Sequence, residues 1–525
     1  MLNCGGRKDA DSERAEEPGI VHSGSICRYG NTVIIIFLAC YFFFMPFVLM
    51  LYYLADPALN KGDIPAFALR LHRRLSPRYE KWARQRVASK RAERLEIEDI
   101  SGTEWPAFGS VFYLWATESL QRQWEQNTEL SPNAPKAYAS GAIEAAAALV
   151  TDPGQAAWVK EHWGQDYLHT ENVFYRMLLI SAMTSYHKLL GGDKYMAALR
   201  DQVESLSRQL DESRHGLLDD YPGQCYPTDV VAAIAAISHA DAVLGTDHSD
   251  FVKSSVRGFQ GELVDSTGLP PYAADSVAGT IGIARGCSSQ WAVLWAPQLW
   301  PETARQWYRR FEQHFWQKRY QAVGFREFPR AMAELDWHMD VDAGPVIAGF
   351  GGSASAFGLG AARTNGRFDH AHPLSAQLIV LSWPLPDGTL FVPRILSNAA
   401  DAPYLGEASI LFALTRMPAE GVEIKTGGNV PGIVYIAMML YLAVGVVVTL
   451  AALARFRRWS RRRPRGNPAL AEVQLGIWII LVGVGIAAAI TRSLAVGMLL
   501  ILFAQLLPRG ATRKTNAPSR QKDGA

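Results

Sequence analysis

The sequence is poor in cysteine, in net charge and in segments that resemble β-strands. Only five cysteines occur in 525 residues, at positions 4, 27, 40, 225 and 287. Their spacing matches neither a disulfide framework nor a zinc-type metal site. There is no HExxH motif, and the glycine-rich stretch 349–362 lacks the Lys-Ser/Thr pair of a phosphate-binding loop. We therefore expect no metal and no cofactor.

The formal net charge is +2, and charged residues make up 19% of the chain. A balance this close to neutral gives no general attraction to nucleic acid, which we do not expect as a partner. The hydrophobic content of 49% is high for a soluble protein. Long apolar runs at the two ends of the chain account for it.

Segments 32–54 and 430–453 are apolar and long enough to span a bilayer. A signal peptide is the alternative for the first, but no small-residue cleavage site follows it. The stretch 473–507 is too long for one ordinary helix and carries Arg492 near its middle, which predicts two short spans or one long tilted helix. Seven arginines in 455–465 mark the cytoplasmic side. We therefore expect a multi-pass protein of the cell membrane, with the large central part outside the cytoplasm.

These features divide the chain into consecutive segments. They are a cytoplasmic tail (1–30), a transmembrane anchor (31–55), a basic juxtamembrane helical linker (56–103), a helical body (104–425), a transmembrane helix (430–453), a basic cytoplasmic loop (454–472), one long or two short transmembrane helices (473–507) and a cytoplasmic tail (508–525). The basic residues of the linker predict contact with lipid headgroups or a solvated helix face.

Apolar residues in the body recur at helical spacing, and small-residue helices alternate with charged ones. About ten to twelve helices in antiparallel pairs fit an all-α, (α/α)6-type toroid better than a four-helix bundle. The best strand candidates are 375–383 and 387–396, of which the first is equally good as a helix.

Three segments of the body, 215–244, 267–296 and 324–362, share one pattern: a loop with aromatic residues, proline and acids leads into a small-residue helix. In the first segment, Pro227 and Thr228 are typical of a helix start. Asp229 then falls in the first turn, where the helix dipole favours a carboxylate. The repetition predicts inner helices whose loops meet at one mouth.

Paired carboxylates in an aromatic-lined site are what glycoside cleavage needs, because one protonates the leaving oxygen while the other activates water or attacks. Taken singly, each acid in these loops is more readily a helix cap or a salt-bridge partner. The expected catalytic acids are Asp229 with Asp340 or Asp342, and Glu327 and Asp220 in reserve; further loop acids are Asp219 and Asp275. The expected substrate-binding residues are Tyr221, Tyr226, Tyr272, Arg285, Gln290, Arg326 and Trp337. Cys225 and Cys287 are candidate reactive thiols, buried filler or a disulfide pair.

The segment ENVFYRMLLISAMTSYHKLLGG at 171–192 resembles a helix of the linalool dehydratase/isomerase family in its Glu-Asn-aliphatic-x-Tyr opening and Leu-x-Gly-Gly close. The alternating helices also resemble the six-hairpin (α/α)6 toroid of many glycosidases. Both resemblances imply the same fold. The first also implies acid/base hydration or dehydration of a terpene alcohol by Asp, His and Cys residues.

Three functions follow as alternatives. The leading one is a membrane-anchored glycan hydrolase or lyase that acts on an envelope polysaccharide. The second is a lyase or isomerase on a small hydrophobic alcohol, with Cys225 and Cys287 participating. The third is a non-catalytic glycan-binding or envelope-assembly protein. The expected partners are the lipid bilayer and other membrane proteins.

Overall fold

The computed structural model describes residues 31–340, 343–460, 468–491 and 494–506. The chain forms two compact units. Residues 46–440 make up one, the helical body, and residues up to 45 and from 441 onward make up the other, the terminal unit.

The terminal unit is built from apolar helices. A helical segment begins at Asn31, contains a π-helical turn over Cys40–Phe44 and continues into α2 (Met45–Leu54). α20 (Gly432–Ser460) starts in the helical body, and α21 (Pro468–Thr491) and α22 (Leu494–Leu506) follow. α21 and α22 contact each other. The last apolar stretch therefore forms two helices instead of one, while Arg492 lies outside the described residues.

Three helices in the described part of the chain are long and apolar enough to cross a membrane: Asn31–Lys61, Pro227–Leu244 and Gly432–Arg458. Within the second, 67% of the apolar window is buried by protein, against 39% and 22% in the first and third. The second is therefore a core helix, apolar nearly all round as predicted. The other two have the exposed apolar surface of helices in lipid, which supports the expected bilayer partner.

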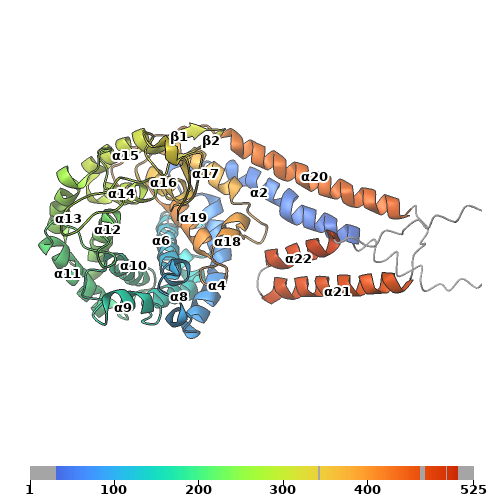
Figure 1. Cartoon of the computed structure of the whole chain (residues 1–525), viewed down its shortest axis with the longest axis horizontal. Helices are drawn as coiled ribbons and strands as arrows, with labels where there is room; N and C mark the ends of the chain where they lie inside the picture. Colours follow the sequence, from blue (N-terminus) through green and yellow to red (C-terminus); the bar gives the residue numbers. More distant parts are fainter. Residues whose placement is uncertain (1–30, 341–342, 461–467, 492–493, 507–525) are drawn as a thin grey trace, which may run out of the picture. The chain divides into compact units, whose positions relative to one another are not determined.

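Six helices of the body form a closed series of contacts. They are α6 (Trp105–Gln126), α10 (Val173–Leu190), α12 (Pro227–Leu244), α14 (Gly286–Leu299), α16 (Gly352–Thr364) and α19 (Leu405–Thr415). Each packs against the next in this order, and α19 packs against α6, which closes a ring. Figure 1 shows α10, α12 and α14 on the inside of the body, with α9, α11, α13 and α15 around them.

The outer helices are amphipathic and cover the ring. They are α4 (Ala66–Ala88), α8 (Ser140–Val150), α9 (Ala157–Trp163), α11 (Met196–Glu212), α13 (Ser249–Ser255), α15 (Pro301–Phe315) and α17 (Phe368–Leu381). Short helices lie between them: α3 (Ala58–Lys61), α5 (Ile100–Thr103), α7 (Pro135–Tyr138) and α18 (Phe391–Leu396). The expected charged helices are found in α4, α11 and α15, whereas α8 and α17 each carry one acidic residue and no Lys or Arg. α4, which begins well before residue 104, packs on α8 and α19 and buries Phe67, Leu71 and Leu75. The compact body therefore includes part of the segment expected to be a linker.

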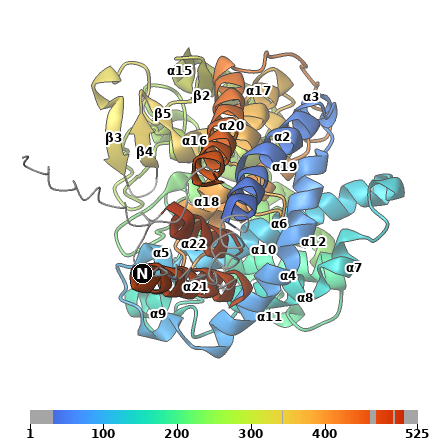
Figure 2. The same cartoon turned by 90° about the vertical axis from the view of Figure 1, so that its right-hand side faces the viewer.

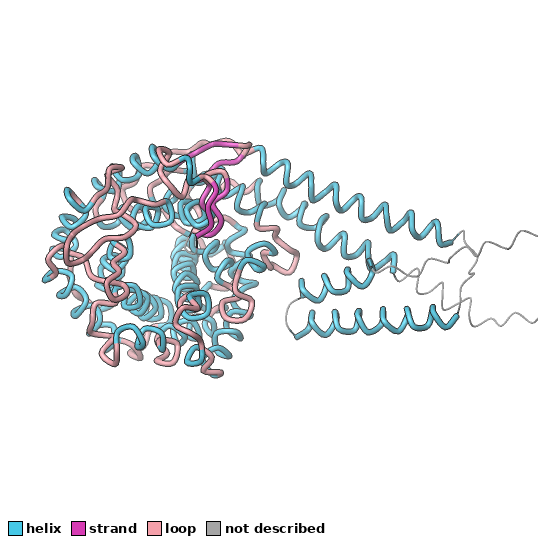
Figure 3. The backbone as a smooth tube through the Cα atoms, in the orientation of Figure 1, coloured by secondary structure: helices cyan, strands magenta, loops and turns pink. Residues whose placement is uncertain are grey.

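The described residues contain two small antiparallel sheets. β1 (Trp316–Arg319) pairs with β2 (Ala322–Phe325), and β3 (Trp337–Asp340), β4 (Gly344–Ile347) and β5 (Phe350–Gly351) form the other. Figure 3 shows how little strand there is among the helices. For 375–383 the helix alternative is confirmed, because 375–381 belongs to α17. The strand expected at 387–396 is wrong, because 391–396 is α18. Short apolar runs do not distinguish a buried strand from a buried helix, and packing of α17 on α16 decides here.

An aromatic cluster crosses the interior of the ring. It consists of Trp115 of α6, Trp291 and Trp295 of α14, and Phe412 of α19. The Trp115 ring centroid lies 4.8 Å from that of Trp295 and 5.3 Å from that of Phe412. Because α14 adjoins neither α6 nor α19 in the order of ring contacts, these rings join helices from opposite sides.

Replacing Trp295 by alanine tests the importance of this cluster. The side chain is 2% exposed, and removing a buried aromatic ring costs about 3–5 kcal/mol of folding free energy. We expect a clearly lower thermal unfolding midpoint for Trp295→Ala, measured by circular dichroism on the full chain in detergent. Val277→Ala, at a position 76% exposed, is the control and should unfold with the parent; equal midpoints for both variants would contradict the prediction.

Candidate active site

A cavity of about 660 Å³ lies at the N-terminal ends of the six ring helices. Every one of these helices contributes lining residues from its first turns. They are Trp105, Phe108 and Phe112 of α6, Phe174 of α10, Thr228 and Asp229 of α12, Cys287, Ser288, Gln290 and Trp291 of α14, Ser353 and Phe357 of α16, and Leu405 and Ser409 of α19. Helix N-termini present free N–H groups and a positive dipole end, so negative charge is favoured here.

The three predicted loops contribute unequally to this cavity. Six expected residues line it: Tyr221, Tyr226, Asp229, Tyr272, Cys287 and Gln290. All of these come from the first two loops or the helices that follow them. The third loop contributes its helix α16, through Ser353 and Phe357, but none of its acids.

Asp220 and Asp229 form a pair of interacting carboxyl groups. Asp229 lines the cavity in the first turn of α12. Asp220 is 1% exposed, and its Oδ2 accepts the Tyr226 N–H at 2.7 Å. Burial and the charge of Asp229 raise the pKa of Asp220 well above its usual value, outweighing the N–H groups of Tyr226 and Phe174. Asp220 is therefore the member of the pair that holds a proton.

Glu104 is a cavity acid that the sequence reasoning missed. It precedes Trp105 and Pro106 at the start of α6, and it is hydrogen-bonded to the Tyr221 hydroxyl. Burial, followed by the charges of Glu104, Asp220 and Asp229, raises the pKa of Tyr221 well above its usual value, so the hydroxyl stays protonated and donates to Glu104. Pro227 marks the helix start that selected Asp229, and Pro106 marks a comparable helix start directly after Glu104 and Trp105.

Two further groups around Tyr221 were also not predicted. Glu98 and His162 line the cavity. The His162 ring meets the Tyr221 ring edge to face, with centroids 5.2 Å apart. Burial lowers the pKa of His162, which favours its neutral form.

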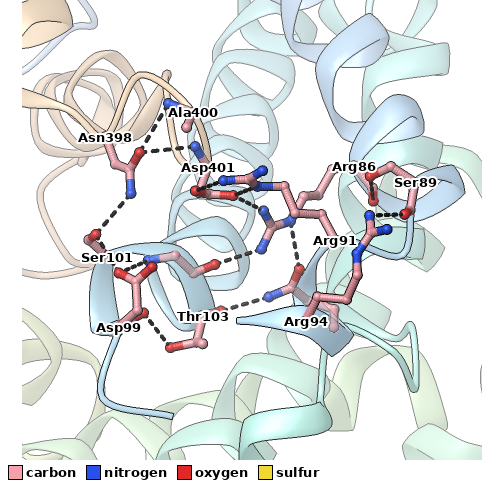
Figure 4. Close-up of polar contacts among 12 residues, drawn as sticks. Arg86, Ser89, Arg91, Arg94, Asp99, Ser101, Thr103, Asn398, Ala400 and Asp401 are labelled. Carbon is pink, nitrogen blue, oxygen red and sulfur yellow. Dashed lines mark hydrogen bonds and ion pairs between the residues drawn. The ribbon is translucent and has the colours of Figure 1, made fainter. Parts of the chain in front are cut away.

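A buried polar network holds the segment that carries Glu104. Arg86 of α4 donates to the Gly102 carbonyl at 2.6 Å and to Gln155 at 3.2 Å, and Gln155 donates to the Thr103 carbonyl at 2.6 Å. Arg86 is also ion-paired with Asp401. Figure 4 shows these contacts converging on the turn at Asp99–Thr103. The network therefore positions the backbone directly before Glu104.

The acids of the third loop are engaged elsewhere. Glu327 is completely buried; it accepts Nε of Arg285 at 2.9 Å and the backbone N–H of Cys287 at 3.1 Å. Asp340 pairs with the same Arg285 at 3.1 Å. Glu327 thus caps α14. Arg285 in turn lies 4.5 Å from the centroid of the Tyr272 ring, which it positions at the cavity.

Two expected binding residues also lie away from the lining. Arg326 forms an ion pair with Asp336 at 2.6 Å, and Trp337 is 71% exposed on β3. Asp342 lies outside the described residues. Linear spacing could not reveal that Trp337 belongs to the sheet β3–β5 and does not line the cavity.

Cys225 and Cys287 are both free thiols. Cys225 is buried, and burial with the surrounding acids raises its pKa, so it is an unreactive thiol. No group of three or more His, Cys, Asp or Glu side chains suited to a metal ion occurs within the described ranges. No family model matches the chain, and no curated protein matches it.

Breaking the network under Glu104 should destabilise the body. The side chains of Arg86 and Asp401 are 2% and 4% exposed. Arg86→Ala removes the donor to the Gly102 carbonyl and to Gln155, while Asp401 keeps its ion pair with Arg91. Each buried polar group left without its partner costs about 1–3 kcal/mol. We expect Arg86→Ala to lower the unfolding midpoint strongly. Arg84→Ala is the control: its ion pairs with Glu80 and Glu144 are exposed and worth about 1 kcal/mol at most. An Arg86 effect no larger than the Arg84 effect would refute the assignment.

The proton on Asp220 predicts a pH-dependent stability. The folded protein holds this proton at a pH where the unfolded chain, with an ordinary pKa of about 3.9, has lost it. The stability from this group is full below that value and is lost as pH rises toward the raised folded pKa. Asp220→Asn removes this loss, so the unfolding midpoint of the variant relative to the parent should rise between about pH 5 and pH 8.

The matched control is Asp275→Asn. Asp275 is exposed and accepts the N–H groups of Ala278 and Val277, which lower its pKa. The contribution of Asp275 to stability is complete at neutral pH and is lost only in acid. The difference in unfolding midpoint between Asp275→Asn and the parent should therefore stay constant between about pH 5 and pH 8. A flat difference for Asp220→Asn as well would show that Asp220 is ionised in the folded protein.

Proposed function

We propose that the chain is a membrane-anchored acid/base enzyme whose helical body is an (α/α)6 toroid that cleaves a carbon–oxygen bond of a glycan at its mouth. The supporting observation is the cavity at six helix N-termini, which brings Asp229 and Glu104 together with aromatic side chains. Six ring helices that alternate with outer helices support the toroid.

The carboxyl groups divide into a proton source and a base. The Asp220–Asp229 pair holds one proton, which resides on Asp220 at rest and passes to Asp229. Asp229 then delivers it to the glycosidic oxygen as the bond to the anomeric carbon breaks. Glu104, which is hydrogen-bonded to the Tyr221 hydroxyl, takes a proton from the water that attacks this carbon. Trp105, Tyr226 and Tyr272 supply flat surfaces for sugar rings. The volume of about 660 Å³ fits a short glycan end.

A second function draws on the apolar part of the lining. Ile97, Phe108, Phe112, Phe174 and Phe357 would suit a small hydrophobic alcohol. The same groups would then dehydrate it: Asp229 protonates the hydroxyl, which leaves as water, and Glu104 takes a proton from the neighbouring carbon. Cys287 lines this cavity, whereas Cys225 is buried.

Amide variants of the cavity acids test both reactions. Full chain in detergent is incubated with envelope polysaccharides and, separately, with terpene alcohols; new reducing ends, unsaturated products and alcohol loss are counted. General acid/base groups contribute about 100-fold or more to rate, so Asp229→Asn and Glu104→Gln should each lower kcat by that factor. Asp250→Asn, at an exposed acid that pairs with Lys253, is the control and should keep parental activity.

The outcomes separate the alternatives. Turnover of glycan alone supports the first function, and turnover of alcohol alone supports the second. Full activity in Asp229→Asn or in Glu104→Gln would contradict the mechanism. Glycan binding without turnover, unchanged in both variants, would support a non-catalytic binding protein.

We also propose that the body lies outside the cytoplasm. The support is the run of arginines at 455–465, directly after the apolar part of α20. Protease added to sealed, right-side-out membranes should then cleave body loops such as 275–281; protection there with cleavage in inverted vesicles would reverse the orientation.

A further inference from the structure

The small sheet β3–β5 exposes an unusual group of apolar side chains. Trp337 pairs with Ile347, and Met339 pairs with Pro345. Alternate residues of a strand share a face, as do directly paired residues, so these four lie together. Trp337, Met339 and Ile347 are 71%, 74% and 53% exposed. We call Trp337, Met339, Pro345 and Ile347 the apolar hairpin face.

The opposite side of the hairpin packs on the body. Val346 is 2% exposed, and the His338 ring meets the Phe328 ring with centroids 5.7 Å apart. β4 also contacts α16, and Figure 2 shows β3 and β4 beside it at the edge of the body. The orientation is therefore determined by packing, and the apolar hairpin face is turned outward.

This face is joined to the start of α20 through the β1–β2 turn. The Gln321 carbonyl accepts the Ile433 N–H at 2.9 Å, in the first turn of α20. Two residues before it, Arg319 pairs with Asp336 at 2.6 Å, and Asp336 directly precedes Trp337. Directly after β4, the Ala348 carbonyl accepts a hydrogen bond from the Gln317 side-chain amide at 3.2 Å.

The β1–β2 turn has features of an interfacial segment itself. Tyr320 and Gln321 have φ of 51° and 63°, a left-handed turn that would favour Asn-Gly. The turn nevertheless uses tyrosine and leaves it 68% exposed. Lys318 and Arg319 are at the same turn. Aromatic rings beside basic residues are typical of the membrane–water boundary.

We propose that the apolar hairpin face and Tyr320 insert into the headgroup–acyl boundary of the bilayer that α20 enters, with Lys318 and Arg319 at the lipid phosphates. The bilayer is favoured over a second copy of the chain because the face is linked, through Asp336, Arg319 and Gln321, to the start of α20. That part of α20 also exposes apolar side chains, at Tyr435, Ile436 and Met439. This contact is independent of the chemistry in the cavity.

Site-specific photo-crosslinking tests the contact. A photoreactive amino acid is placed at position 339 or 347 of the full chain, reconstituted in vesicles of phosphatidylcholine with a minority of phosphatidylglycerol. Position 439 of α20 is the reference inside the bilayer, and position 277, whose valine is 76% exposed, is the exposed control. Lipid adducts, detected by mass, should be several-fold more abundant at 339 and 347 than at 277.

A charge in the apolar hairpin face provides the second arm. Met339→Asp should lower lipid labelling at 347 several-fold, because a carboxylate is costly at the acyl boundary, whereas Val277→Asp should leave it unchanged. Labelling at 339 and 347 no higher than at 277, with lipid adducts at 439, would overturn the proposal. Adducts to a second copy of the chain at 339 would overturn it in favour of a dimer interface.

Discussion

Aromatic packing across the ring is the interaction on which the arrangement of the helical body depends. Trp115, Trp295 and Phe412 come from helices that are not all neighbours, and their contacts hold α6, α14 and α19 in one register. Trp291 belongs to this cluster and also lines the cavity, so its ring is part of both the hydrophobic core and the cavity wall. The packing of these aromatic side chains between the helices thus helps to determine how the helix N-termini are arranged around the cavity.

The acids that line the cavity and the buried arginines around it have different surroundings. At the cavity, Glu104 and Asp229 lie at helix starts, where the dipoles favour negative charge. Around the cavity, the buried arginines bind structural partners. Arg86 binds carbonyls and Asp401, and Arg285 binds Glu327 and Asp340. Glu327 and Asp340 bind Arg285 and therefore position residues around the cavity, whereas Glu104 and Asp229 line it.

The local signals near helix starts predicted the beginning of α12 and several of the residues that line the cavity. Pro227 and Asp229 correctly placed the beginning of α12, and the aromatic residues Tyr221, Tyr226 and Tyr272 line the cavity as expected. The same reasoning overlooked Glu104, because residues 104–126 were treated as an ordinary helix and its first residue was not weighed as a loop acid. It also placed the acids of the third loop at the cavity. The short β-sheet between Phe325 and α16, which contains Asp340, has no strong alternating pattern in its sequence and was therefore not predicted.

The sequence by itself determined what depends on neighbours along the chain: the apolar end helices, the alternation of buried and amphipathic helices, and the acid in the first turn of α12. Hydrophobic periodicity and capping act over a few residues, so they are legible in one dimension. Only the tertiary structure decided which acids share a cavity and which are paired with Arg285 or Arg326, because those partners are far apart in the chain. It also decided that Trp337 faces outward, since β-pairing of residues 337–340 with 344–347 determines on which side the ring lies.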